Sequence, residues 1–137
     1  MTAVDVVVAV DGVDDIVAAR QAGRELAGKL AFSLTDVTLI ATAISEVARN
    51  IANYAGHGEI RLGVVQRGGR RALVIEAADE GPGIADIEQA MEDGYSTSGG
   101  LGLGLPGARR MTDDFEVVSE PGAGTTVTMW KWLPHDV

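Results

Sequence analysis

Hydrophobic and polar positions repeat along this chain with two periods, which mark different elements. A short Val-rich run over residues 3–10 is typical of a strand. Residues 16–30 carry apolar side chains at helical spacing. Ser33 can cap a second helix, with Asp36 three residues on as in a capping box, and this helix runs to about Tyr54. The residues expected on its buried side are Val37, Ile40, Ile44, Val47 and Ile51.

The second half of the chain predicts mainly strands. Runs at 59–66 and 72–79 flank a basic, glycine-containing turn, which indicates a hairpin. Short helices are expected over 86–92 and 105–111, the latter tolerating Pro106 in its first turn. Strands at 115–119 and 125–132 close the chain.

Two long helices come early and the strands cluster late, so we expect an α+β fold. It would be a two-layer α/β sandwich with a mainly antiparallel sheet covered by helices on one face. A doubly wound parallel sheet needs helices between most strands, and that pattern is absent. The 137 residues contain no repeat or linker, so residues 1–137 are expected to form a single domain.

Composition narrows the classes of function. The net charge of −9 disfavours nucleic acid as a partner, because an acidic surface repels phosphate backbones. The absence of cysteine excludes disulfides, thiolate metal sites and a cysteine nucleophile. The first ten residues do not resemble a secretory signal, and no apolar run approaches the roughly 20 residues that span a bilayer. We therefore expect a cytoplasmic protein without a membrane partner.

The second helix carries a polar pair, Glu46 and Asn50. Residues four apart lie within about 40° on one face, here beside the apolar stripe and at the edge of a buried surface. A carboxylate and an amide placed there could polarise a hydroxyl and coordinate Mg²⁺. Taken alone, however, such a pair is more often an ordinary exposed helix face.

Asp79 ends an apolar strand and is followed by Glu-Gly-Pro-Gly. A carboxylate at a strand end can accept a hydrogen bond from an exocyclic amine such as that of adenine. Glycines such as Gly81 and Gly83 let a planar ring approach the backbone. A simple tight turn explains the same residues equally well.

Residues 96–105 are rich in Gly, Ser and Thr and lead into a helix, an arrangement that can cradle an anion. The segment fits G-x-G-x-x-G, but it follows a loop rather than a strand, and no Gly-Lys-Ser/Thr occurs. Dinucleotide and Walker A sites are thus rejected, while a flexible surface loop stays an alternative. Thr125 and Thr126 follow a glycine turn and could either meet an adenine edge or merely begin a strand.

The order of these four motifs resembles the GHKL (Bergerat-fold) family of gyrase B, Hsp90, histidine kinase catalytic domains and MutL. Residues 46–50 are similar to its N box, 79–83 to its first glycine box and 99–104 to its second. Residues 15–26 and 40–51 are most similar to the small anti-sigma and switch kinases, especially the RsbT-type group of stress-signalling modules (stressosomes). The likeness covers essentially the whole chain.

The resemblance implies roles for these residues in binding ATP and Mg²⁺. Glu46 would be the general base and Asn50 the ligand of Mg²⁺. Asp79 would bind the adenine amine, with Thr125 or Thr126 assisting, and Gly81 and Gly83 would line the adenine pocket. Residues 96–98 would belong to the ATP lid. The phosphates would be covered by Gly99, Gly100, Leu101, Gly102, Leu103 and Gly104.

The implied function is a protein serine/threonine kinase that phosphorylates a STAS-domain antagonist and, once released, activates a PP2C-type phosphatase by partner switching. One alternative is an RsbW/SpoIIAB-like anti-sigma factor that binds a sigma factor, and another is a nucleotide-gated binding module without transfer activity. A complete sensor histidine kinase is disfavoured, because His57 and His135 lie outside any dimerisation helix.

Overall fold

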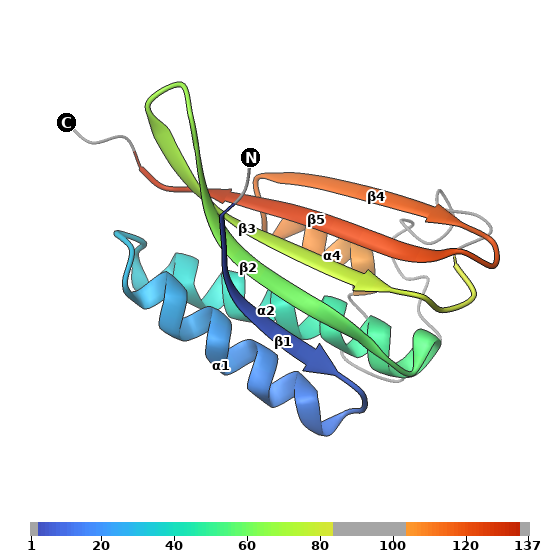
Figure 1. The fold of residues 1–137 in the computed structure, drawn as a ribbon. Helices are drawn as coiled ribbons and strands as arrows, with labels where there is room; N and C mark the ends of the chain where they lie inside the picture. The colour runs from blue at the N-terminus through green and yellow to red at the C-terminus, as the bar shows by residue number, and fades with distance from the viewer. Residues whose placement is uncertain (1–2, 84–103, 135–137) are drawn as a thin grey trace.

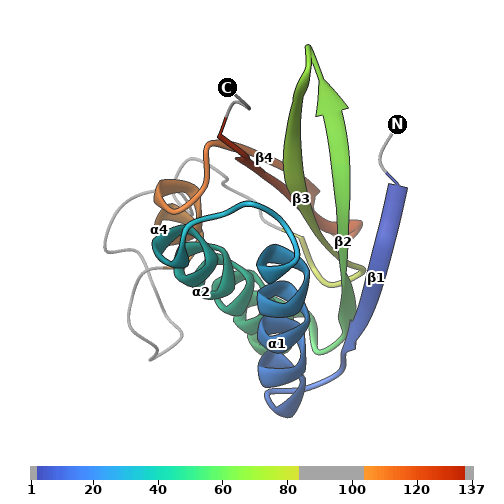
Figure 2. The same cartoon turned by 90° about the vertical axis from the view of Figure 1, so that its left-hand side faces the viewer.

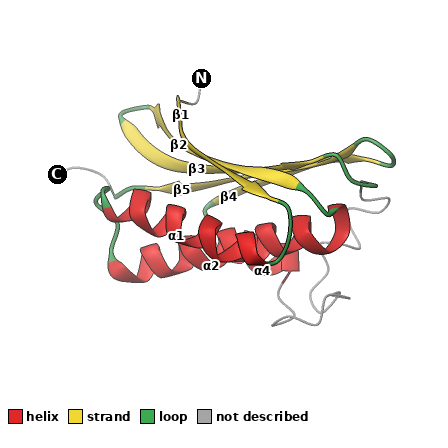
Figure 3. Cartoon of the chain, turned by 60° about the horizontal axis from the view of Figure 1, so that its bottom comes forward, coloured by secondary structure: helices red, strands yellow, loops and turns green. Residues whose placement is uncertain are grey.

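The computed structural model describes residues 3–83 and 104–134. A five-stranded sheet has the order β1-β2-β3-β5-β4, and every neighbouring pair is antiparallel. The helices lie together on one face of this sheet, so the expected two-layer α+β architecture is confirmed (Figures 1–3). The strands are β1 (Ala3–Val10), β2 (Gly58–Arg67), β3 (Arg70–Asp79), β4 (Asp114–Glu120) and β5 (Gly124–Trp132). The helices are α1 (Asp14–Gly28), α2 (Leu34–Asn50) and α4 (Gly104–Arg110), and a π-helical turn (Ile51–Ala55) extends α2.

The core lies between the sheet and α2. Side chains alternate along each strand, so Ile60, Leu73 and Met129 face the helices and are fully buried. All five residues expected on the buried side of α2 belong to this core or pack against it. Gly23 lets α1 approach α2 closely, because a Cβ at this position would overlap the Cδ1 atom of Ile44.

Element boundaries follow the sequence predictions to within two residues at most ends. Ser33 caps α2 as expected, its Oγ accepting a hydrogen bond of 3.1 Å from the N–H of Asp36. The predicted continuous helix to Tyr54 is α-helical only to Asn50 and then widens into the π-helical turn, which ends at Gly56 with a φ of 83°. The helix expected over 86–92 lies outside the described residues.

Among the described residues, none of the helices has the length and apolar character needed to cross a bilayer.

Candidate functional site

Asp79 is the last residue of β3, and it pairs with Gly58 on one side and Thr125 on the other. Its Oδ1 accepts two backbone hydrogen bonds, from Gly81 at 2.9 Å and from Thr125 at 3.2 Å. The first bond closes the turn after the strand, in the manner of an Asx turn. The second joins the end of β3 to the start of β5, so the carboxylate is fixed in direction at this edge of the sheet.

Thr125 and Thr126 lie on opposite faces of the sheet. Thr125 is opposite Asp79, only 5% exposed, and its hydroxyl lies 2.8 Å from the Oγ of Ser119. Thr126 is opposite Ala78, and because side chains alternate along a strand, it points to the face away from the helices. Thr125 is therefore the threonine that shares a site with Asp79.

Gly81 and Gly83 are required by close approaches of the backbone. A Cβ on Gly81 would lie 2.6 Å from the Cβ of Ala55, the last residue of the π-helical turn. Gly83 has a φ of 77°, and a Cβ there would overlap the carbonyl oxygen of Glu120. The loop after β3 therefore packs closely against the π-helical turn on one side and against the end of β4 on the other.

Glu46 is 6% exposed, and both of its carboxylate oxygens are engaged. Oε1 pairs with the Arg49 guanidinium at 2.6 Å, while Oε2 accepts a hydrogen bond of 3.0 Å from the N–H of Gly104. Asn50, half-buried, is the last residue of α2. The prediction that both residues lie at the edge of a buried surface is confirmed.

The end of α2 and the end of β3 meet at Gly58. A Cβ on Gly58 would lie 3.0 Å from Ile51 Cγ2 and 3.0 Å from Asp79 Cβ. Because Ile51 directly follows Asn50, the helix motif and the strand motif, about 30 positions apart in sequence, come together at one end of the sheet. This is the arrangement that a site formed from both motifs requires.

The second glycine motif is described only at its last residue. Gly104 begins α4 with a φ of 52°, and its N–H is the donor to Glu46. The other expected phosphate-binding residues (Gly99, Gly100, Leu101, Gly102 and Leu103) and the lid residues 96–98 lie outside the described part of the chain.

The side chains at this end of the sheet suit a metal ion that takes few protein ligands and is held mainly by phosphate groups. Within residues 3–83 and 104–134, no three His, Asp or Glu side chains gather as a metal site. Asn50 offers an amide oxygen, which suits Mg²⁺, and this ion commonly takes one or two protein ligands and completes its shell with phosphates and water.

Sequence reasoning missed three neighbours of the predicted residues. Arg49 pairs with Glu46, and its i, i+3 spacing on the helix was a signal available in the sequence. Ser119 contacts Thr125, and this pairing follows only from the β4–β5 register. Ala55 lies against Gly81 because the helix widens after Asn50, for which the sequence offered no signal.

The comparisons with known proteins agree with this arrangement. Residues 35–136 match the family of histidine kinase-, DNA gyrase B- and HSP90-like ATPases, and the chain belongs to this family. It is 55% identical over 119 residues to the serine/threonine-protein kinase RsbT of Bacillus subtilis (strain 168), covering 87% of this chain and 90% of that protein. It is 32% identical over 123 residues to an anti-sigma F factor of Thermoanaerobacter sp. (strain X514), covering 86% and 85%. The family predicted from the ordered motifs is thereby confirmed.

Two solved structures share the fold. The RsbU and RsbW domains of Rv1364c from Mycobacterium tuberculosis align with a TM-score of 0.59 and 18% identity, over 96% of this chain and 34% of that one. The mycobacterial sensor histidine kinase MprB aligns with a TM-score of 0.54 and 23% identity, over 93% and 97%.

Proposed function

We propose that this protein is an ATP-dependent serine/threonine kinase that phosphorylates a partner protein in a stress-signalling, partner-switching pathway. The observation that carries the proposal is the meeting of the Glu46–Asn50 helix motif with Asp79 and Thr125 at one end of the sheet. The 55% identity to a serine/threonine-protein kinase, over most of both chains, supports the same activity. The cytoplasm, where ATP and a protein acceptor are both available, is the location that goes with it.

The residues around Asp79 bind the adenine of the nucleotide. Asp79 Oδ1 is occupied by two backbone amides, so its carboxylate is held still while the other oxygen accepts the adenine amine. Thr125 lies beside it on the same face, and Gly81 and Gly83 form the narrow wall of the adenine pocket. The glycine segment from Gly99 to Gly104 supplies backbone amides to the phosphates.

Transfer of the phosphoryl group falls to the α2 side. Glu46 accepts the proton of the acceptor serine or threonine hydroxyl. The oxygen of that hydroxyl bonds to the γ-phosphorus of ATP as the bond between the γ-phosphorus and ADP breaks. Asn50 would hold Mg²⁺, and the bound ion would neutralise charge on the phosphates. Each oxygen of Glu46 accepts one hydrogen bond, from Arg49 or from Gly104, and keeps a second lone pair that can accept the proton.

The partners we propose are a STAS-domain antagonist as the phosphate acceptor and a PP2C-type phosphatase as the activation target. A second candidate function is an anti-sigma factor that binds a sigma factor, supported by the 32% identity to anti-sigma F factors. The kinase is favoured because the identity to RsbT is much higher over a similar length.

The proposal is tested by transfer of labelled phosphate from Mg²⁺-ATP to a STAS-domain protein of the same organism. We expect a phosphoserine or phosphothreonine product. Glu46→Ala should slow transfer by roughly 10²- to 10⁴-fold with little change in nucleotide affinity, because it removes a general base. Asn50→Ala should also abolish transfer.

Asn53→Ala is the matched control for Asn50→Ala, because Asn53 is exposed three residues later on the π-helical turn. Unchanged transfer by Glu46→Ala would remove the base assignment. Binding of ATP and of a sigma factor, without transfer to any STAS-domain protein, would move the function to the anti-sigma candidate.

A further inference from the structure

The β2–β3 hairpin concentrates positive charge in an acidic chain. Between residues 60 and 75 the sequence has four arginines and no Asp or Glu, whereas the whole chain carries a net charge of −9. The hairpin extends beyond the other strands, with Arg67, Gly68, Gly69, Arg70 and Arg71 at its tip (Figure 1). The tip of the hairpin is thus locally basic in a chain whose net charge is negative.

The arginines of the hairpin differ in how their charge is compensated. Arg61, in the middle of β2, donates to Glu59 and Glu76, each at 2.9 Å, and its hydrogen bond with Glu59 raises the pKa of Arg61. Arg67 and Arg71 are exposed, and within the described part of the chain no carboxylate lies in ion-pair range of these two or of Arg70. The tip therefore carries three guanidinium groups that have no ion-pair partner among the described residues.

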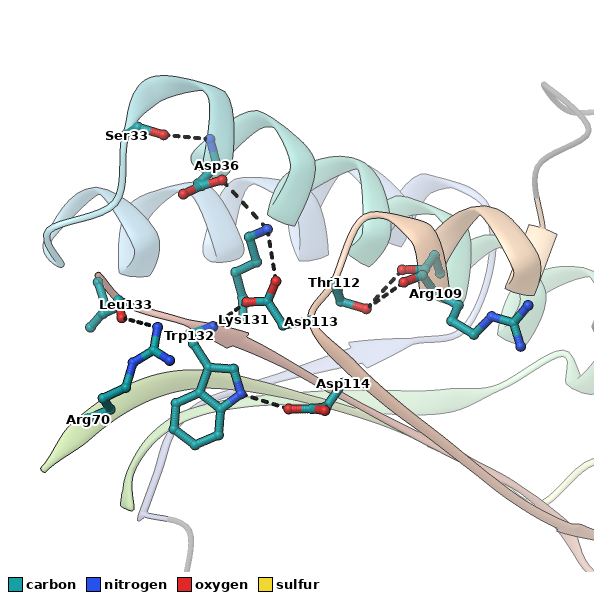
Figure 4. Close-up of polar contacts among 11 residues, drawn as sticks. Ser33, Asp36, Arg70, Arg109, Thr112, Asp113, Asp114, Lys131, Trp132 and Leu133 are labelled. Atoms are coloured by element: carbon teal, nitrogen blue, oxygen red, sulfur yellow. Dashed lines mark hydrogen bonds and ion pairs between the residues drawn. The ribbon is translucent and has the colours of Figure 1, made fainter. Parts of the chain in front are cut away.

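Arg70 also lines a hollow of about 480 Å³ at the base of the tip. Its Nη2 donates to the carbonyl oxygen of Leu133 at 3.0 Å, and its guanidinium carbon lies 5.5 Å from the centre of the Trp132 ring (Figure 4). Its Nε is buried and has no acceptor among the residues that the structure describes. A buried donor without an acceptor raises the free energy of the folded state, and an acceptor supplied by a partner would remove that cost. The hollow is lined by Asp36, Arg70, Asp113, Lys131, Trp132 and Pro134.

The acidic groups around the hollow are already engaged. The Lys131 ammonium lies 3.6 Å from a carboxylate oxygen of Asp36 and 3.6 Å from one of Asp113, between α2 and the start of β4 (Figure 4). Asp113 also accepts the N–H of Trp132 at 2.7 Å, and Asp114 accepts the indole N–H at 2.7 Å. The lining thus sets two carboxylates, Asp36 and Asp113, against two cations, Lys131 and Arg70, so the excess positive charge of this surface comes from Arg67 and Arg71.

We propose that the hairpin tip and this hollow form a docking surface for an acidic segment of a partner protein. One carboxylate of the segment would enter the hollow and accept from Arg70 Nε, while others face Arg67 and Arg71. Arg and Trp are enriched among the residues that contribute most to binding at protein interfaces, and both are present here. A phosphate polymer fits less well, because the remainder of the chain is acidic and would repel it.

The surface is distant from the candidate nucleotide site. Asp79 pairs with Gly58 at one end of the hairpin, and Arg67 pairs with Arg70 at the other, nine residues along β2. At about 3.3 Å per residue, roughly 30 Å separates the two ends. A docked partner would thus leave the Asp79 end of the sheet open, and the inference stands independently of the chemistry proposed there.

The tryptophans provide a direct readout, because the chain has two of them, Trp132 in the lining of the hollow and Trp130 two residues away on the same face of β5. The full chain is titrated with a tryptophan-free 12-residue peptide of alternating Glu and Leu while tryptophan fluorescence is followed. A Lys–Leu peptide of the same pattern and a 12-nucleotide oligothymidylate are titrated in parallel. We expect a saturable change with the Glu–Leu peptide only, and its affinity should fall several-fold between about 50 mM and about 500 mM salt.

The double variant Arg67→Glu/Arg71→Glu should weaken binding of the Glu–Leu peptide at least tenfold. Its matched control is Arg24→Glu/Lys29→Glu, which makes the same change of charge at an exposed position within α1 and at one just beyond its C-terminal end. This variant should leave the affinity within about twofold. The proposal is overturned if the Glu–Leu peptide gives no saturable change, or if both double variants lose the same affinity. Equal or tighter binding of oligothymidylate would also overturn it and assign the surface to nucleic acid.

Discussion

The backbone N–H of Gly104 donates a hydrogen bond of 3.0 Å to Oε2 of Glu46, which joins the first residue of α4 to α2 across 58 positions of sequence. The other oxygen of the same carboxylate is held by Arg49. A displacement of Gly104 would release one oxygen of Glu46 while Arg49 keeps the side chain in place. In the proposed reaction, the position of α4 would thus set how many hydrogen bonds the base accepts.

Arg49 should stabilise the fold through Glu46. Arg49→Ala is expected to lower the free energy of unfolding by about 1–3 kcal/mol, because it takes a donor from a carboxylate that is 6% exposed. The loss should shrink when Glu46 is neutral, so Glu46→Gln/Arg49→Ala should cost less than the sum of the single changes. Urea unfolding of the four proteins measures this coupling. Strict additivity would show that the ion pair contributes nothing.

Asp79→Asn should weaken binding of a non-hydrolysable ATP analogue by roughly tenfold or more, since a hydrogen bond to a charged group contributes about 1.5–3 kcal/mol. The asparagine keeps an Oδ1 acceptor for the amides of Gly81 and Thr125, so the melting temperature should change little. Calorimetric titration measures the affinity. Glu80→Gln serves as the control, because it removes the same charge at the next residue, which is exposed. Equal affinity of Asp79→Asn and the parent protein would refute the adenine assignment.

Two glycines of the β4–β5 turn separate backbone strain from steric overlap. Gly122 and Gly124 have φ values of 81° and 88°, but a Cβ on Gly122 meets nothing within 4 Å, whereas one on Gly124 would overlap the carbonyl oxygen of Asp79. Gly122→Ala should cost about 1–2 kcal/mol of stability from the left-handed conformation alone. Gly124→Ala should cost clearly more and should also weaken nucleotide binding. Denaturant unfolding compares them, and equal losses would mean that the contact with Asp79 is unimportant.

The architecture could be predicted because its elements are marked locally. The alternation in the strands, the apolar stripe of α2 and the cap at Ser33 are all properties of neighbouring residues, and the structure confirms them. The juxtaposition of the end of α2 with Asp79 was expected only through the family resemblance, since nothing in the spacing of Asn50 and Asp79 requires contact.

The remaining features depend on register and helix geometry. Which of Thr125 and Thr126 lies on the same face as Asp79 became clear only when β3 and β5 were paired, because a shift of one residue exchanges the two faces. The engagement of Glu46 by Gly104 depends on where α4 packs, which local pattern does not encode. The roles of residues 99–103, which lie outside the described ranges, stay predictions.

Stability should respond to acid through Glu59. The Arg61 guanidinium, by its hydrogen bond, lowers the pKa of Glu59 below the ordinary value of 4.5. Because the pKa of Glu59 is lower in the folded state, the Glu59–Arg61 interaction stabilises the fold fully at pH values above the unfolded-state pKa. That stabilisation is lost as the pH falls through the folded-state pKa. We therefore expect Arg61→Met to return the pKa of Glu59 towards 4.5, as measured by NMR titration of its side chain. Arg67→Met, at an arginine without a carboxylate partner in the described chain, should leave that titration unchanged.

The π-helical turn fixes the length of the chain between Asn50 and Gly56. A π turn holds more residues than an α turn, so deleting one residue from it would shorten the segment that carries Ala55. Ala55 would then leave its place against Gly81, even if every remaining side chain were kept. Substitutions of the exposed Asn53 should therefore be tolerated, while insertions and deletions among relatives that share this turn should fall outside it.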